Sequence, residues 1–288
     1  MARHADVVGR YVYLEIDGTE YRVYYEEAGE GIPLLCQHTA GADGRQWRHL
    51  LEDPEITANY RVIAHDLPLH GKSLPPATSR WWAEEYKLSQ DFFMKFLVAL
   101  SEALELNQPA YIGSSMGGHM AADLALNFPE KFRAVIGCEA ALDSHGTETL
   151  LPYFFHPRIS SEFKPATMYG LCAPSSPELQ RRETTWIYSQ GAPVVFKGDL
   201  NYYVQEHDLS ETAKDIDTSK IDVYFMSGEY DWSAAPEDTK ALADEVKGSK
   251  YILMAGLGHF PMCENYEVFK TFLYPVLDEI RTKSLASA

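Results

Sequence analysis

The sequence contains few cysteines and no long hydrophobic run. The four cysteines among the 288 residues form no C-x-x-C pair and no regular spacing, which disfavours a disulfide framework and a zinc site and favours reduced thiols in a cytoplasm. The most apolar stretch, residues 92–100, is interrupted by Lys95 and has about half the length that crosses a bilayer. Residues 1–8 lack the apolar core of a secretory signal. We therefore expect a cytoplasmic protein with no segment that spans or enters a membrane. The cysteines are Cys36, Cys138, Cys172 and Cys263.

Positive charge is also scarce. Lysine and arginine number 25 against 42 acidic residues, which gives a formal net charge of -17. A field of this sign repels phosphate backbones and anionic lipid, so nucleic acid and membrane surfaces are disfavoured as partners. Solubility explains the charge most simply, and an acidic funnel for a cationic substrate is the alternative. With 45% hydrophobic residues, the chain has enough apolar surface to bury a large core in one or two globular units.

The order of apolar runs predicts an α/β protein. A hairpin is expected from 11–16 and 21–25, joined by the Asp17-Gly18 turn. After it, short apolar runs alternate with helix-length segments, a pattern typical of βαβ units and a mostly parallel sheet. The expected central strands are 33–36, 61–64, 110–112, 134–138, 223–226 and 251–254.

Three helices of the core can be predicted from apolar spacing. One begins after the N-cap Ser89, and another starts just after Ser115 and ends before Pro129. The last carries apolar residues from Phe269 to Ile280 on one face, with Pro275 expected to kink it.

The segment 142–220 differs from the rest, because it has helical patches and many aromatic residues but no clear central strand. We expect it to form a helical cap over the strand ends, inserted between a first core part (1–141) and a second core part (221–288). The sequence shows no internal repeat and no low-complexity linker.

The sharpest local signal is the G-x-S-x-G pentapeptide Gly113 to Gly117, which follows a predicted strand and precedes a predicted helix. Glycines flank the serine because the chain must turn sharply there, with no room for side chains. Ser115 is expected at the apex, where the helix N-terminus directs amide donors at a developing oxyanion. Ser114 is the competing hydroxyl, but it occupies the first variable position of the motif.

A serine nucleophile needs a general base and a carboxylate that orients the base. Asp231 lies in the loop after the predicted strand 223–226, and His259 lies in the loop after 251–254, next to Gly258. Both are thus expected at the carboxyl edge of the sheet with Ser115. Glu139, which follows the strand 134–138, remains an alternative acid, and Glu229 is a third candidate.

These motifs resemble those of α/β-hydrolases with a helical cap, in particular small esterases, lactonases and carbon-carbon bond hydrolases with a G-x-S-M-G-G elbow. The resemblance covers nearly the whole chain and implies the α/β-hydrolase fold, a mostly parallel central sheet flanked by helices with an inserted cap. It also implies an oxyanion hole built from the amide of Met116 and that of Thr39 or Ala40. The sequence departs from the family where Thr39 replaces the glycine after His38, and where Leu69 stands at a position that is usually glycine.

The expected function is cleavage of a small carboxylic ester or lactone through an acyl-enzyme on Ser115, with no metal or organic cofactor. Carbon-carbon cleavage of a diketone-like or vinylogous keto acid substrate is an alternative, because it uses the same groups. A non-catalytic small-ligand receptor is a third hypothesis. Perhydrolysis, as in cofactor-free haloperoxidases, also stays open, whereas dehalogenases and epoxide hydrolases carry aspartate where Ser115 stands.

The substrate is expected to be a small apolar or aromatic molecule, because the cap is rich in aromatic residues. Packing of these residues between the cap and the sheet is the alternative interpretation. Arg181 and Arg182 of the cap are candidates for binding a substrate carboxylate, and solvated surface is the simpler interpretation of such a pair. No pattern in the sequence sets an oligomeric state.

Overall fold

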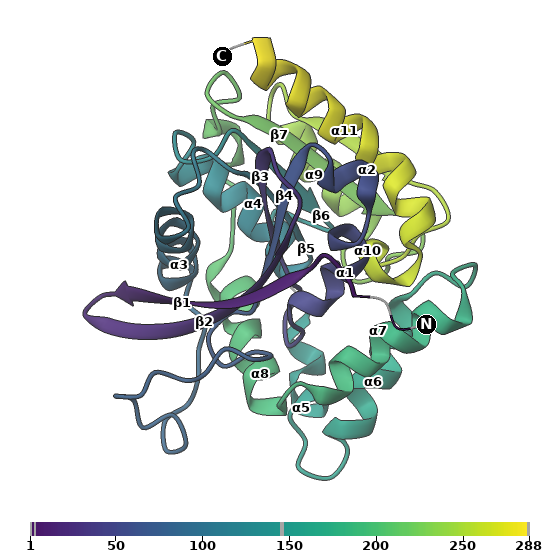
Figure 1. The fold of residues 1–288 in the computed structure, drawn as a ribbon. Helices are drawn as coiled ribbons and strands as arrows, with labels where there is room; N and C mark the ends of the chain where they lie inside the picture. The colour runs from purple at the N-terminus through teal and green to yellow at the C-terminus, as the bar shows by residue number, and fades with distance from the viewer. Residues whose placement is uncertain (1, 3, 145–146, 287–288) are drawn as a thin grey trace.

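A single eight-stranded sheet runs through the protein in the computed structural model, which describes residues 2, 4–144 and 147–286 (Figure 1). The strand order is β1-β2-β4-β3-β5-β6-β7-β8. The β1–β2 hairpin is antiparallel, and β2 joins β4 antiparallel, whereas all pairs from β4 to β8 are parallel. The mostly parallel sheet and the α/β class predicted from the sequence are confirmed.

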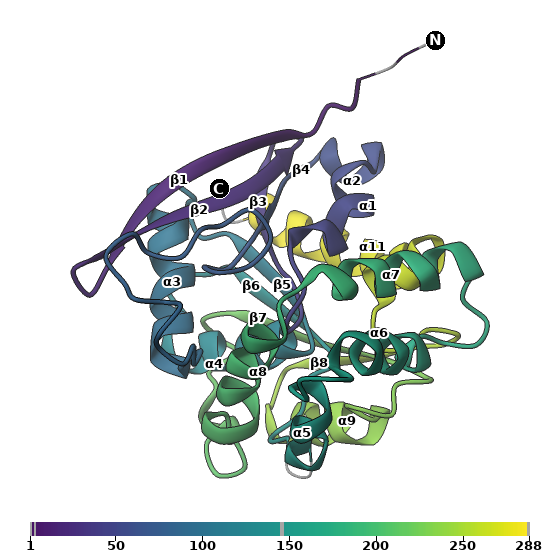
Figure 2. The ribbon, with the colours of Figure 1, turned by 90° about the horizontal axis from the view of Figure 1, so that it is seen from below.

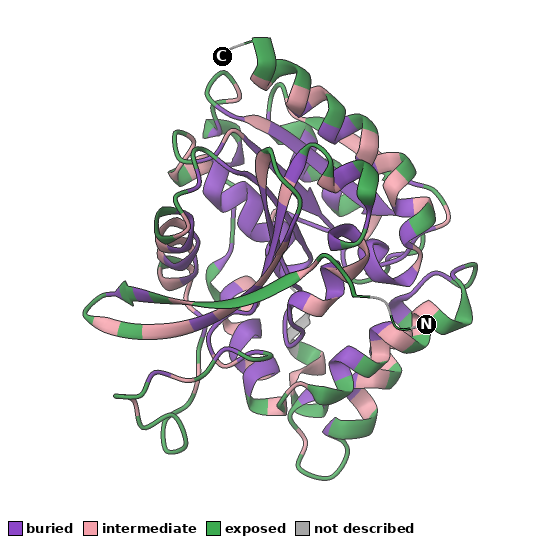
Figure 3. Ribbon diagram, viewed as in Figure 1, coloured by how far each residue is buried: buried purple, intermediate pink, exposed green. Residues whose placement is uncertain are grey.

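Every strand expected from an apolar run is present, with ends that extend by a few residues at most. The central strands are buried on both faces because helices cover both, which explains why their sequences are continuous apolar runs (Figure 3). The two edge strands are more exposed, β1 over its first half and β8 at Lys250 and Leu253. The strands are β1 Val8–Ile16, β2 Thr19–Ala28, β3 Ile32–Gln37, β4 Tyr60–His65, β5 Ala110–Ser114, β6 Ala134–Cys138, β7 Asp222–Gly228 and β8 Lys250–Met254.

Helices form a layer on each side of the sheet, with α3 and α4 on one face and α11 on the other (Figure 1). Ser89 caps α3 as predicted, since its side chain accepts from the Phe92 amide at 3.2 Å. The helix predicted after Ser115 ends at Asn127, and Pro275 lies inside the last helix. The helices of these layers are α1 Arg48–Leu51, α2 Pro54–Thr57, α3 Gln90–Ala103, α4 Met116–Asn127, α9 Pro236–Glu245, α10 Pro261–Glu264 and α11 Tyr266–Ala286.

The chain between β6 and β7, which we call the cap segment (142–220), is helical and lies together at one end of the sheet (Figures 1 and 2). Several of its aromatic residues, among them Phe154, Tyr188 and Phe196, pack into the core cluster that also contains residues of α3 and α4. It therefore covers the region where the parallel strands end. The helices of the cap segment are α5 Leu151–Phe154, α6 Ser160–Leu171, α7 Glu178–Gln190 and α8 Pro193–Asn201, followed by a π-helical turn at Tyr202–Glu206. Short 3-10 turns lie at Thr147–Leu150 and Ala213–Asp215 of this segment, and a third, Gly44–Trp47, lies in the core between β3 and β4.

The structure bears on the expectations about membrane spans and cysteines. Within residues 2, 4–144 and 147–286, no helix is both long and apolar enough to cross a bilayer. All four cysteines are free thiols and buried. Burial raises the pKa of the Cys36 and Cys138 thiols well above the ordinary value, so these side chains remain neutral.

Candidate active site

Ser115 occupies the sharp turn between β5 and α4. Its backbone has φ 55° and ψ -117°, a conformation that L-residues rarely adopt, and its amide is held by the Cys138 carbonyl at 2.9 Å. A Cβ on Gly113 would overlap the Gly117 carbonyl oxygen, which explains why the turn needs glycine on that side. The strained turn presents the Ser115 side chain at the start of a helix, as the G-x-S-x-G pattern predicts.

Asp231 and His259 meet at the same edge of the sheet, each in the loop after its strand. His259 Nδ1 lies 2.6 Å from Asp231 Oδ2, and both side chains are buried. The other oxygen, Oδ1, accepts from the amides of Ser233 at 2.8 Å and Ala234 at 3.3 Å. These bonds fix the carboxylate, which in turn directs the Nδ1 proton and leaves Nε2 as the basic nitrogen.

The competing candidates from the sequence serve other contacts. Both Glu139 oxygens accept from the Gly228 amide at 3.0 Å, and burial, followed by the neighbouring Asp231 charge, raises the pKa of Glu139 well above its usual range. Glu229 accepts from the Gly256 amide at the surface. The structure thus pairs His259 with Asp231, and the Glu139 carboxyl lies next to Asp231 without contacting His259.

Ser114 is fully buried, and its hydroxyl contacts the His259 carbonyl at 3.4 Å. This contact shows that the turn at Ser115 and the His259 loop are direct neighbours.

The backbone amides proposed for an oxyanion hole differ in their availability. Met116 is the first residue of α4, so its amide has no intrahelical acceptor. The Thr39 amide already donates to Gln46 Oε1 at 2.9 Å. The next amide, that of Ala40, has no acceptor among the described residues. Of the two amides left open by the sequence, Ala40 is therefore the one that is free to bind a ligand.

Ser115, His259 and Ala40 line one cavity, which has a volume of about 40 Å³. This volume is well below the roughly 300–1,000 Å³ typical of ligand pockets, so the side chains around Ser115 leave little open space. The cap aromatics Phe154, Tyr188, Phe196 and Tyr203 contribute to the wall. Leu150, Thr167, Met168, Leu171, Trp232 and Ser233 complete the lining.

Arg181 and Arg182, the candidates for binding a substrate carboxylate, lie away from this wall. Their guanidinium groups lie over the Tyr169 ring, 4.0 Å and 4.5 Å from its centroid. Both also pair with Glu178, at 3.9 Å for Arg181 and 2.7 Å for Arg182. The two arginines thus bind neighbours of the cap surface and leave the cavity lining uncharged on that side.

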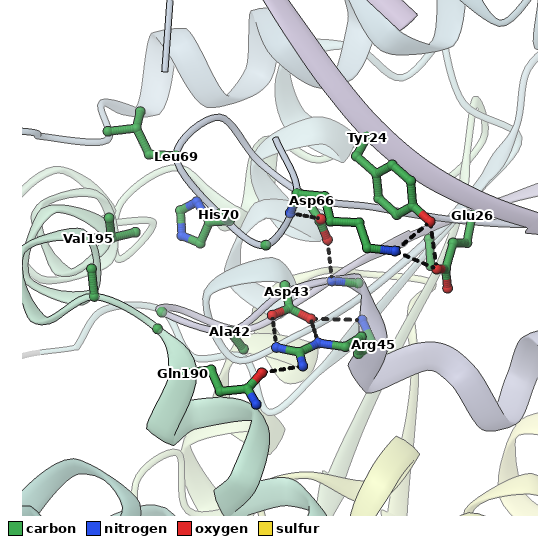
Figure 4. Close-up of a pocket in the computed structure, with 17 residues that line it drawn as sticks. Tyr24, Glu26, Ala42, Asp43, Arg45, Asp66, Leu69, His70, Gln190 and Val195 are labelled. Atoms are coloured by element: carbon green, nitrogen blue, oxygen red, sulfur yellow. Dashed lines mark hydrogen bonds and ion pairs between the residues drawn. The ribbon is translucent and has the colours of Figure 1, made fainter. Parts of the chain in front are cut away.

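A larger cavity of about 400 Å³ lies on the outer side of the loop 41–45 (Figure 4). Its charged groups bind one another: Arg45 pairs with Asp43 at 2.6 Å, and Lys72 donates to the Tyr24 hydroxyl at 2.9 Å. Asp66 accepts from the Lys72 amide at 2.7 Å. Burial, followed by the Asp43 charge, raises the pKa of Asp66 to about 6. The dashed lines in Figure 4 show this network of paired groups.

The loop at Asp66 is fixed by these contacts. Leu69 has φ 71° in this loop, a left-handed conformation that glycine adopts more readily than leucine. Sequence reasoning gave no role to Gln46 or Asp199, whose side chains hold the loop that carries Ala40. No pattern in the sequence marks either residue. No group of three or more histidine, cysteine or acidic side chains within the described ranges is arranged to hold a metal ion.

Comparison with known proteins agrees with this architecture. Residues 32–164 match the family model described as alpha/beta hydrolase fold. The chain is 31% identical over 123 residues to 2-hydroxymuconate semialdehyde hydrolase of Pseudomonas sp. (strain CF600). That alignment covers 42% of this chain and 41% of the relative, so the match spans about two fifths of the relative's length.

Two solved structures are similar over nearly the whole chain. A thermophilic esterase from Thermogutta terrifontis superposes with a TM-score of 0.81 at 18% identity, covering 94% of this chain and 99% of the esterase. The enol-lactonase from Burkholderia xenovorans LB400 gives 0.79 at 18% identity, covering 93% and 100%. At such identities the likeness concerns the fold. The sheet topology, the family-model match over residues 32–164 and these neighbours together show that the chain has the α/β-hydrolase fold.

Proposed function

We propose that this chain is a serine hydrolase that cleaves a small, uncharged carboxylic ester or lactone through an acyl-enzyme on Ser115. The observation that carries the proposal is that His259, whose Nδ1 lies 2.6 Å from the buried Asp231 carboxylate, lines the same cavity as Ser115. A serine at a strained turn, beside a histidine with one free nitrogen, is the arrangement that nucleophilic acyl transfer requires.

Each side chain has a defined role in this mechanism. His259 Nε2 removes the proton from Ser115 Oγ as the hydroxyl attacks the carbonyl carbon, and Asp231 stabilises the imidazolium that forms. The amides of Met116 and Ala40 donate to the tetrahedral oxyanion. The imidazolium then protonates the leaving alcohol, and water activated by His259 hydrolyses the acyl-enzyme and restores Ser115.

The cavity wall supports an apolar substrate without a carboxylate. Aromatic and aliphatic side chains dominate the wall, and no lysine or arginine lies among its described residues. A substrate carboxylate placed there would lose its hydration without gaining a counter-charge, which costs several kcal/mol. Esters and lactones with hydrocarbon substituents satisfy this environment better than ionised acids do.

The small volume of the cavity implies that the cap segment moves during the reaction cycle. About 40 Å³ accommodates only a few water molecules, so a substrate must displace cap side chains to reach Ser115. Trp232 bridges the two parts at the cavity wall, since its indole donates to the Gly170 carbonyl at 3.1 Å. We take the cap segment (142–220) as a lid on a hydrolase core formed by 1–141 and 221–288.

Carbon-carbon bond hydrolysis is the second candidate, favoured by the 31% identity to 2-hydroxymuconate semialdehyde hydrolase. The same triad serves that reaction, but a muconate is an ionised acid. Because Arg181 and Arg182 lie outside the cavity wall, the ester or lactone assignment has the stronger support.

Hydrolysis of p-nitrophenyl esters of increasing acyl length tests the assignment with wild type, Ser115→Ala and the matched control Ser114→Ala. We expect Ser115→Ala to lower kcat by at least about 10⁴-fold without loss of fold, because the nucleophile is removed. Ser114→Ala, which removes the neighbouring hydroxyl, should keep kcat within a few-fold of wild type.

Equal rates in wild type and Ser115→Ala would contradict the nucleophile assignment. If no ester is turned over, cleavage of a dienoate keto acid would support the carbon-carbon alternative, and ligand-induced stabilisation without product would support a receptor.

A further inference from the structure

A fully buried carboxylate of the cap segment, that of Asp199 on α8, binds the loop that carries Ala40. Asp199 Oδ2 accepts from the Gly41 amide at 2.7 Å and from His70 Nε2 at 2.8 Å. The other oxygen accepts from the Tyr86 hydroxyl at 3.0 Å. One cap residue thus joins three separate segments of the core.

The charge on Asp199 is balanced inside the protein. Both ring nitrogens of His70 face acceptors, Nε2 the Asp199 carboxylate and Nδ1 the Pro68 carbonyl at 3.0 Å. A ring that donates from both nitrogens is an imidazolium, so His70 and Asp199 form a buried ion pair. Such a pair holds its geometry strongly, because separating the partners leaves an unpaired buried charge.

The loop around Ala40 is fixed on both sides of that residue. Gln46 binds the Thr39 amide, and Asp199 binds the Gly41 amide. The amide between them, that of Ala40, is free and lies in the cavity wall with Ser115. Its direction is therefore set by two side chains, one from the core and one from the cap.

The contact between α8 and this loop leaves no space for adjustment. Gly41 has φ 66°, and a Cβ there would overlap the Phe196 ring of α8. Figure 4 shows Val195 of the same helix beside His70, above the loop that carries Ala42. Any displacement of α8 that admits a substrate would therefore also remove the acceptor of the Gly41 amide.

We propose that Asp199 is a positioning residue that couples closure of the cap to formation of the oxyanion hole. When α8 docks, its carboxylate binds the Gly41 amide and directs the neighbouring Ala40 amide at the oxyanion site. When the cap is displaced, this restraint is lost and the hole is incomplete. This inference rests on the serine hydrolase function proposed above. It adds that the position of the cap determines whether Ser115 has a complete oxyanion hole.

The test compares wild type with Asp199→Ala, Asp199→Asn and Tyr86→Phe in hydrolysis of a p-nitrophenyl ester. Rates are expressed per active site titrated with a p-nitrophenyl phosphonate. Asp199→Ala should lower kcat by ~10–100-fold, less than the ~10²–10³-fold for deletion of a whole oxyanion donor, with KM changed less than threefold. Asp199→Asn keeps an oxygen for the Gly41 amide and should recover most of the rate.

Tyr86→Phe is the matched control, because it removes another donor to the same carboxylate and leaves the Gly41 contact intact. It should keep kcat within threefold even if the melting temperature falls. Affinity for a trifluoromethyl ketone, which forms a tetrahedral oxyanion on the serine, should fall in Asp199→Ala by the same factor as kcat/KM.

Unchanged kcat per titrated site in both Asp199 variants, or an effect on KM alone, would overturn the coupling and leave the hydrolase assignment intact. Should Asp199→Ala fail to fold, Asp199→Ser, which also removes the carboxylate, replaces it in the rate and ketone measurements, because a purely structural role lowers stability without changing the rate per active site. A wild type that neither turns over esters nor reacts with the phosphonate would overturn both proposals.

Discussion

Two buried histidine–aspartate pairs flank the loop that carries Ala40, and they differ in the second nitrogen of the histidine. His259 donates from Nδ1 to Asp231 and lines the cavity beside Ser115. His70 donates to Asp199 from Nε2 and to the Pro68 carbonyl from Nδ1, so neither of its nitrogens is free. In the proposed mechanism the first pair moves a proton, whereas the second, which we call the fixed pair, keeps both histidine nitrogens bound while α8 is docked.

A third pair shows that the second arrangement is the commoner one in this protein. His207 contacts Asp123 from Nδ1 at 2.9 Å and the Ala141 carbonyl from Nε2 at 3.1 Å. Burial by itself lowers the pKa of His207, but the Asp123 carboxylate outweighs it and raises that pKa. An adjacent carboxylate therefore does not identify a catalytic histidine; a free nitrogen directed at a nucleophile does.

The largest expected effect comes from removing the carboxylate charge in each pair. Asp231→Asn should lower kcat by ~10³–10⁴-fold, because the amide no longer stabilises the imidazolium or selects its tautomer. Asp199→Asn should cost less than about tenfold, since there the oxygen position is needed more than the charge. Steady-state kinetics of the two variants on one ester measure the contrast.

Glu139→Gln is the matched control for Asp231→Asn. Burial, followed by the Asp231 charge, raises the pKa of Glu139 well above its usual range, and glutamine keeps an acceptor for the Gly228 amide, so kcat should stay within a few-fold of wild type. A loss in Glu139→Gln as large as that in Asp231→Asn would instead identify Glu139 as part of the acid.

The next effect in size is the pH dependence of folding stability that the His70–Asp199 pair is expected to produce. Burial lowers the pKa of His70, but Asp199 outweighs burial, and the pKa in the folded state is raised. The pair therefore stabilises the fold fully below the unfolded pKa of about 6.5 and loses this contribution as pH rises through the folded pKa. The melting temperature of wild type should exceed that of His70→Asn most at acidic pH, with a gap that narrows above about pH 6.5.

The titratable and charged groups that face the His70–Asp199 pair are the same in wild type and in His70→Asn. They come from the core (His38, His65 and Asp66), from the connecting loop (Tyr86) and from the cap (Lys164 and Tyr203). Burial lowers the pKa of both His38 and His65 to about 3, so neither titrates in this range. A gap that widens as pH rises would show that His70 is neutral in the folded protein.

The sequence predicts the sheet and the turn at Ser115 well, for physical reasons. Strands buried on both faces must be continuous apolar runs, and a turn with no room for side chains must use glycine. Asp231 and His259 were found because chain order and position after a strand restrict where they can lie. These constraints are local or repeat along the chain, so they can be read from it.

The contacts that fix Ala40 are of another kind. Gln46 and Asp199 reach the loop from seven and 158 residues away, and neither lies in a recognisable motif. Whether Thr39 or Ala40 keeps a free amide depends on where these side chains lie, which no spacing rule states. The cap aromatics were equally ambiguous, since Phe154 and Phe196 line the cavity but Tyr153 and Phe155 are exposed.

The smallest expected effect is a change in the free energy of unfolding, which tests whether the backbone at Leu69, next to His70, is strained. Leu69 has φ 71° next to His70, and a left-handed L-residue costs roughly 1–2 kcal/mol. Leu69→Gly removes this strain, while the greater freedom of glycine in the unfolded chain costs about 0.5–1 kcal/mol. The net result should be a free energy of unfolding equal to wild type or up to about 1 kcal/mol higher.

Leu74→Gly is the control, because Leu74 lies in the same connecting loop but outside the left-handed region, and this variant should instead lose stability. Urea melts measure the free energy of unfolding of both variants. Equal losses in both would show that Leu69 is unstrained and that its side chain contributes packing.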